Sequence, residues 1–179
     1  MAMKSTVTLN FGVVKIELTQ DDLSALKGRF TRNPLYRGPC LIINRDTGLA
    51  LDAHPDAKPG GHTCLWQPHA APWQQWRLHG TGGGTIEIIS ESSGLYLTAM
   101  AEGHEWGETW LHDTVKPGWS RQWRIKNTDD GVAFAIQNAT SGYALDAGQH
   151  AENLSDPHLW PTTHWDPWQQ WIIARLPLT

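Results

Sequence analysis

The chain has 179 residues, of which 40% are hydrophobic and 18% are charged, and its formal net charge is −4. This length suits one domain with a short extension, and the apolar fraction is large enough to form a buried core. The charge balance gives no basic surface for nucleic acid or for anionic membranes, and no segment approaches the ~20 apolar residues of a membrane span, which argues against membrane insertion. Eleven tryptophans, against three Phe and three Tyr, indicate repeated core positions, binding platforms, or both.

The first 35 residues are predicted to form an N-terminal extension. Apolar residues alternate over 7–11 and again over 14–18, which predicts one or two strands. Thr19 could cap a short helix that ends near Lys27. The extension is a candidate for covering one end of the core or for a homodimer contact. It lacks the continuous apolar core of a signal peptide, so we expect a protein that is cytoplasmic or secreted by an unconventional route.

Residues 36–179 contain three related segments, at about 36–80, 81–128 and 129–179. Each has an Ile two residues before an Asn or Ser, then a Ser- or Thr-Gly turn, and a Leu three residues after that Gly. Each repeat closes on a Trp, and the closing residues Trp76, Trp123 and Trp171 are 47 and 48 residues apart. Equal spacing of this kind identifies an internal repeat, so the three segments are expected to have one shared structure.

Each repeat has the pattern of short strands rather than helices. Apolar runs are short and are interrupted by Gly, Asn, Ser and Pro, with no helical period. The polar side chain of the turn can bond to its own backbone and the Gly accepts a positive φ, so the turn should join two strands as a hairpin. A unit of this size cannot bury its own apolar face, so three units must share one core, with Leu51, Leu97 and Leu145 pointing inward.

Three repeats that each contain such a hairpin and end in a Gln-x-Trp-like triplet resemble the ricin-type lectin family. The triplets are Gln74-Gln75-Trp76, Arg121-Gln122-Trp123 and Gln169-Gln170-Trp171, so the middle one departs from the pattern. The resemblance implies an all-β fold, a β-trefoil of twelve strands with pseudo-three-fold symmetry over residues 36–179. It also implies shallow sugar sites, one per repeat, and glycans or glycoconjugates as partners.

A protein site for sugar needs an aromatic face for the apolar side of the ring and a carboxylate or amide for adjacent hydroxyls. Repeats one and three offer both, with the aromatic residue fourteen positions after the aspartate. The candidate residues are Asp52, Trp66, His69 and Gln74 in repeat one, and Asp146, Gln149, Trp160, His164 and Gln169 in repeat three. In the family, the aspartate is the main hydroxyl acceptor and the aromatic residue is the platform, and this arrangement serves galactose and N-acetylgalactosamine.

The sequence departs from the family pattern at several positions. Trp73 and Trp168 stand where the family often has Asn, and Pro55 replaces the polar residue that Gln149 supplies in repeat three. Repeat two has Thr98 in place of the aspartate, although Trp110 and His112 remain. We therefore expect at most two sites. The family's disulfide positions are held by Ala50 and Pro68, so Cys40 and Cys64 are expected to be reduced thiols.

Two other interpretations stay open. The aspartates could only cap turns and the aromatic residues could only pack, which would leave a protein–protein interaction scaffold with degenerate sugar sites. The sequence has no nucleophile motif, phosphate loop or metal triad, so we expect no enzyme activity and no cofactor. His54, His62 and His69 lack metal-ligand spacing, so no metal site is predicted.

Overall fold

A computed structural model describes residues 6–11, 14–19, 38–102, 105–114, 118–162 and 166–176. Regular structure in these ranges consists of strands and two single-turn 3-10 helices, η2 (Pro72–Gln74) and η3 (Pro167–Gln169). None of the helices in the described ranges is long and apolar enough to cross a membrane. The prediction of an all-β chain is confirmed.

The alternating segments near the N-terminus form a two-stranded antiparallel sheet. Strands β1 (Thr6–Phe11) and β2 (Val14–Thr19) pair along their whole length, from Thr6 opposite Thr19 to Phe11 opposite Val14. Among the described strands, neither β1 nor β2 pairs with the larger sheet. The helix predicted after Thr19 lies outside the described residues, and the dimer contact stays a prediction.

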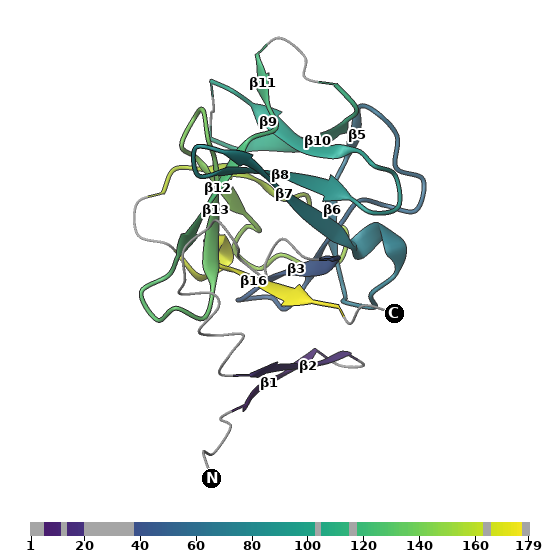
Figure 1. Cartoon of the computed structure of the whole chain (residues 1–179), viewed down its shortest axis with the longest axis vertical. Helices are drawn as coiled ribbons and strands as arrows, with labels where there is room; N and C mark the ends of the chain where they lie inside the picture. Colours follow the sequence, from purple (N-terminus) through teal and green to yellow (C-terminus); the bar gives the residue numbers. More distant parts are fainter. Residues whose placement is uncertain are drawn as a thin grey trace.

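Six strands, two from each repeat, close into a barrel (Figure 1). They are β3 (Cys40–Asn44), β7 (Trp76–Gly82), β8 (Thr85–Ser90), β12 (Trp123–Asn127), β13 (Phe134–Asn138) and β16 (Trp171–Arg175). The antiparallel pairs run β3–β7, β7–β8, β8–β12, β12–β13, β13–β16 and back from β16 to β3. Closure leaves the ring without a free edge, as expected for a trefoil barrel.

The remaining strands of the larger sheet include one hairpin per repeat. Their bounds are β4 (Ala50–Asp52), β5 (Gly61–His62), β6 (Cys64–Trp66), β9 (Tyr96–Met100), β10 (Gly107–His112), β11 (Trp119–Ser120), β14 (Ala144–Asp146) and β15 (His158–Trp160). The hairpins are β4–β6, β9–β10 and β14–β15, with Leu51 opposite Leu65, Leu97 opposite Leu111 and Leu145 opposite Leu159. The identical register in all three repeats confirms the pseudo-three-fold symmetry.

The hairpins also interlock from one repeat to the next. Gly61 pairs with Leu111 of repeat two, and Gly107 pairs with Leu159 of repeat three. The cycle closes where the Leu65 amide of repeat one donates to the Ser155 carbonyl over 2.9 Å. On the symmetry axis the Thr63 and Thr109 hydroxyls lie 2.7 Å apart, and the Thr109 hydroxyl also donates to the Pro157 carbonyl over 3.1 Å. Each hairpin therefore borders the outer face of its neighbour.

The closing tryptophans anchor the hairpins to the barrel. Trp76, Trp123 and Trp171 are all 0% exposed, as predicted. Each indole N–H donates over 2.9 Å to the carbonyl of the inward leucine of its own repeat, so that Trp76 binds Leu51, Trp123 binds Leu97 and Trp171 binds Leu145. A buried indole needs a partner for its N–H, and the repeated leucine carbonyl supplies it.

The predicted turns also form. The Asn44 side-chain oxygen accepts the backbone N–H groups of Asp46 and Thr47, and Asn138 does the same for Thr140 and Ser141. The turn glycines Gly48, Gly94 and Gly142 have φ of +72°, +71° and +77°, a region that glycine adopts without strain. These turns fix the register that brings the candidate aspartates to the outer face of the hairpins.

Candidate functional site

The Asp52 carboxylate lies on β4, directly after the inward-pointing Leu51, and is held from two sides. Its Oδ1 accepts the backbone N–H of His54 over 2.6 Å, and its Oδ2 accepts the Gln74 side-chain amide over 3.0 Å. The Gln74 amide oxygen in turn accepts the His69 backbone N–H over 2.9 Å. Gln74 is 0% exposed and Asp52 is 3% exposed, so the pair is fixed in one geometry.

Repeat three reproduces this arrangement with different neighbours. Asp146 Oδ1 accepts the Gly148 backbone N–H over 2.6 Å, and Oδ2 accepts the Gln169 amide over 2.9 Å. His158, opposite Asp146 on β15, places its Nε2 3.8 Å from Asp146 Oδ1. The structure thus brings the predicted aspartate and glutamine together in both repeats. The bonds to His54 and Gly148 have the turn-capping geometry that the sequence left open.

Burial raises the pKa of both aspartates. For Asp52 the loss of solvent outweighs the hydrogen bonds from His54 and Gln74, which lower the pKa. For Asp146 burial is again the largest cause, and the bonds from Gly148 and Gln169 oppose it. Burial therefore disfavours the ionised form of both carboxyl groups.

The predicted platforms lie on the same outer face as the aspartates. Trp66 is opposite Ala50, and Trp160 is opposite Ala144, two pairs along each hairpin from the pair that contains the aspartate. Alternation along a strand puts Asp52, Cys64 and Trp66 on one side and Leu51 and Leu65 on the other. Both indoles are half-buried, which leaves part of each ring accessible.

The other predicted residues contribute in different ways. His69 is exposed; its backbone binds Gln74, and its ring packs edge-on against Trp73 at 5.8 Å between centroids. Gln149 is exposed in the turn after Asp146. His164 lies outside the described residues. The structure therefore assigns His69 a backbone contact to Gln74.

Repeat two has a different outer face. Thr98, in the aspartate position, donates its hydroxyl to the Trp110 carbonyl over 3.1 Å. Trp110 lies opposite Thr98, and His112 lies opposite Tyr96, so His112 and not Trp110 occupies the platform position. Trp110 instead occupies the position that faces the aspartate in the other repeats, because the strand register rather than residue type decides the position. Trp119 packs edge-on against both rings.

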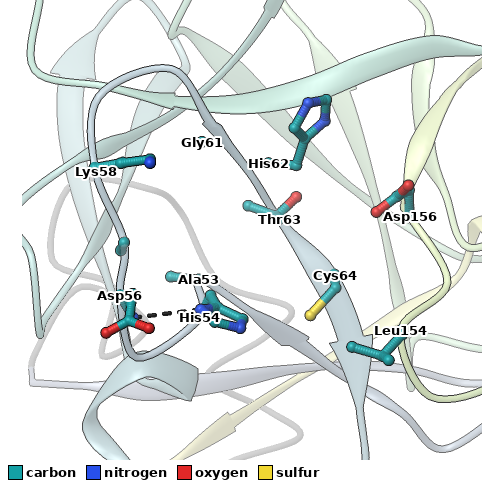
Figure 2. Close-up of a pocket in the computed structure, with 11 residues that line it drawn as sticks. Ala53, His54, Asp56, Lys58, Gly61, His62, Thr63, Cys64, Leu154 and Asp156 are labelled. Atoms are coloured by element: carbon teal, nitrogen blue, oxygen red, sulfur yellow. Dashed lines mark hydrogen bonds between the residues drawn. The ribbon is translucent and has the colours of Figure 1, made fainter.

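A pocket of about 380 Å³ lies beside the Asp52 hairpin of repeat one (Figure 2). Ala53, His54 and Cys64, the neighbours of Asp52 along the chain and across the strand pair, form part of its wall. The 56–62 loop supplies Lys58 and His62, and the loop of repeat three supplies Leu154 and Asp156. Figure 2 shows Cys64 and Leu154 next to each other, with the Lys58 ammonium on the opposite side.

The position that faces the aspartate across the hairpin was missed in the sequence. It holds Cys64 in repeat one, Trp110 in repeat two and His158 in repeat three. A signal was present, because each of these residues is two positions before the platform position. In repeat three the His158 ring closes the space over the turn, so that a Cβ on Gly148 would lie 3.4 Å from it. Among the described residues, no group of three His, Cys, Asp or Glu side chains could hold a metal ion.

Comparison with known proteins gives the same architecture. A family model described as a ricin-type beta-trefoil lectin domain-like family matches residues 33–111 and 72–160. No match was found among curated protein sequences. The designed three-fold symmetric protein ThreeFoil has a TM-score of 0.71 and 22% identity, over 78% of this chain and 99% of its own.

Two natural lectins have similar structures. The ricin B-like lectin of Macrolepiota procera, solved in complex with lactose, has a TM-score of 0.66 and 22% identity, over 77% of this chain and 95% of its own. The Rhizoctonia solani agglutinin has a TM-score of 0.67 and 22% identity, over 76% of this chain and 94% of its own. At this identity the likeness supports the fold and not the ligand.

Proposed function

Because the chain belongs to the family of ricin-type β-trefoil lectin-like domains, we propose that it binds carbohydrate through sites in repeats one and three. The observation that carries this proposal is the buried aspartate–glutamine pair, which occurs in these two repeats and is replaced in repeat two. Its partners are glycans or glycoconjugates of the galactose and N-acetylgalactosamine type.

The hydrogen bonding of each aspartate suits a sugar diol. A carboxylate has about four lone-pair positions, and the backbone and glutamine donors of Asp52 and Asp146 use two of them. Two adjacent sugar hydroxyls can donate to the remaining positions. Their bonds are charge-assisted and favour the ionised carboxylate against the burial that raises the aspartate pKa.

The neighbouring indole supports the apolar side of the same ring. Trp66 and Trp160 are half-buried, so the protein holds the indole and leaves part of it accessible. The axial 4-hydroxyl of galactose leaves one face of the pyranose more continuous than in glucose, which favours galactose on a flat indole. The lactose complex of the Macrolepiota procera lectin, which has the same fold, is consistent with a galactoside.

Binding without chemistry fits these residues better than catalysis does. Glycoside hydrolysis uses two carboxyl groups about 5–10 Å apart on either side of one bond. Asp52 and Asp146 belong to different repeats and so cannot flank one glycosidic bond. Each is also held by a backbone amide and a glutamine, in a role that suits recognition.

A protein–protein scaffold is the second candidate. It is favoured by the burial of Asp52 and Asp146, which are 3% and 1% exposed, and by the turn-capping bonds that each makes. In that case the aspartates serve only the hairpins, and the surface indoles contact another protein.

A calorimetric titration with galactose and lactose separates the two candidates. Asp52→Ala and Asp146→Ala should each weaken one site by ~1.5–3 kcal/mol, roughly ten- to a hundredfold, because a charged hydroxyl partner is lost. The double variant should lose binding at both. Thr98→Ala, at the equivalent position of repeat two, is the matched control and should bind like the parent.

Two results would count against the sugar sites. If the double variant binds as well as the parent, the sites lie elsewhere. If the parent binds no sugar, and a glycan array is also blank, the scaffold is the better description. The tryptophan fluorescence of each variant verifies that the barrel is intact.

A further inference from the structure

Two large apolar side chains are exposed in the part of the chain that the structure describes, Trp106 at 65% and Leu154 at 63%. Both also have a left-handed backbone, with φ of +62° and +73°. Residues with a side chain adopt this conformation at a cost, whereas glycine adopts it freely. The fold does not need an exposed apolar side chain at a left-handed position, so the coincidence of exposure and strain directs attention to a function for these two side chains.

Trp106 and Leu154 occupy one position of the repeat, and Gly60 is the third member. Each directly precedes the residue through which its hairpin joins the next repeat, namely Gly61, Gly107 and Ser155. Gly60 has φ of +81°, so all three share the left-handed backbone. The strained residues are thus the two members of this position that carry a side chain.

This position lies on the outer face of the following repeat. Trp106 belongs to repeat two, yet its ring stacks on His158 at 4.6 Å and 31° and meets Trp160 edge-on at 4.9 Å. His158 in turn lies 3.8 Å from Asp146. Asp146, His158 and Trp106 therefore lie in contact one after another, with Trp106 farthest along from the carboxylate.

This position has a side chain where the neighbouring repeat has the aspartate, and a glycine where it does not. Trp106 borders repeat three and Leu154 borders repeat one, the two repeats with an aspartate–glutamine pair. Gly60 precedes the strand that pairs with repeat two, which has Thr98 instead. At this position a strained, exposed apolar residue occurs only where the neighbouring repeat has the aspartate–glutamine pair.

We propose that the site of repeat three crosses the repeat boundary and that Trp106 binds the second ring of an oligosaccharide whose terminal galactose lies at Asp146 and Trp160. The inference rests on the proposed function and adds the ligand class, a disaccharide or longer chain rather than a monosaccharide. The second sugar lies on the exposed indole face, beside Glu108, which pairs with His158 on the same sheet face.

The test is calorimetry with galactose and with lactose on the Asp52→Ala background, which isolates repeat three. Trp106→Gly reproduces the residue that repeat two has at this position and relieves the backbone strain, so it should fold. It should bring lactose affinity down by about three- to tenfold, toward that of galactose, as expected for the loss of one aromatic contact. Trp106→Phe keeps an aromatic face and should retain most of the advantage of lactose over galactose.

The outcomes separate this inference from the proposed function. If Trp106→Gly retains the parent preference for lactose while Asp146→Ala abolishes binding, the second-ring site is wrong and the galactose site stands. If galactose and lactose bind equally to the isolated repeat-three site, the inference also fails. If neither sugar binds the parent, both the inference and the proposed galactoside function are overturned.

Discussion

The Arg121 guanidinium forms a 2.6 Å ion pair with Glu87 at the position where the other two repeats have a glutamine bound to an aspartate. It also lies 4.4 Å over the Tyr96 ring. Repeat two therefore lacks the amide donor that orients an aspartate, and Thr98 accordingly turns its hydroxyl toward a backbone carbonyl. In repeat two, therefore, both the aspartate and the glutamine of the candidate sugar site are replaced, by Thr98 and Arg121, and both replacements make structural contacts.

Arg121→Gln should destabilise the protein, although it restores the Gln-x-Trp triplet. The Glu87 side chain is 8% exposed and loses its cation, whereas Arg121 is 32% exposed, so solvent screening reduces the cost to about 1–2 kcal/mol. Thermal unfolding measures the difference. Arg77→Gln is the matched control, since its pair with Glu91 is more exposed, and it should cost about 0.5 kcal/mol or less. Equal losses in the two variants would contradict the structural role of Arg121.

The three buried closing tryptophans should contribute similar amounts to the free energy of unfolding. Trp123→Phe removes a 2.9 Å bond to Leu97, leaves a buried carbonyl unpaired and opens a small cavity, at a cost of about 2–4 kcal/mol. Trp76→Phe and Trp171→Phe should cost about the same, because their bonds have the same length. Chemical denaturation measures all three. Trp106→Phe, at 65% exposure, should change stability by less than about 0.5 kcal/mol.

The barrel could be predicted from the sequence because its determinants are local and recur three times. The turn around Gly48, the inward Leu51 and the closing Trp76 each fix one feature of a repeat, and symmetry supplies the rest. Asp52 and Gln74 were assigned to one candidate site from the repeat and its resemblance to the family, and the structure shows that they are hydrogen-bonded. Features that recur at a constant spacing are the ones a single sequence can reveal.

The contacts between repeats could not be predicted in this way. His158 and Trp106 are separated along the chain and belong to different repeats, and only the pairing of β10 with β15 brings them together. The placement of Trp110 and His112 likewise depends on the register of β9 and β10, which gives the platform position of repeat two to His112. The contacts recur at one position of the repeat, but the residue type at that position differs, so the sequence alone does not show which repeats touch there.

Both thiols should be unreactive in the folded protein. Cys40 and Cys64 are free cysteines, and burial is the main cause that raises the pKa of each to about 12. The thiolate is the reactive form, so iodoacetamide should modify neither at mildly alkaline pH, even though Cys64 lines the repeat-one pocket. Mass spectrometry should find two labels after unfolding without reductant. Rapid labelling of Cys64 in the native state, or no labels after unfolding, would contradict this expectation.

Sugar binding should weaken on acidification at a higher pH than for a site with an exposed aspartate. Burial raises the pKa of Asp146, and protonation removes the charged acceptor that two hydroxyls need, so affinity should fall as the pH falls through this raised value. The effect on stability has the opposite sign. A carboxyl group whose pKa is higher in the folded state than in the unfolded state stabilises the fold below the unfolded pKa, and this contribution is lost as the pH rises through the folded one. Calorimetry on the Asp52→Ala variant from neutral to acidic pH follows Asp146 alone, and His158→Gln removes the imidazole 3.8 Å away as a control. An affinity that is the same down to the ordinary range of an aspartate would show that Asp146 does not bind the hydroxyls.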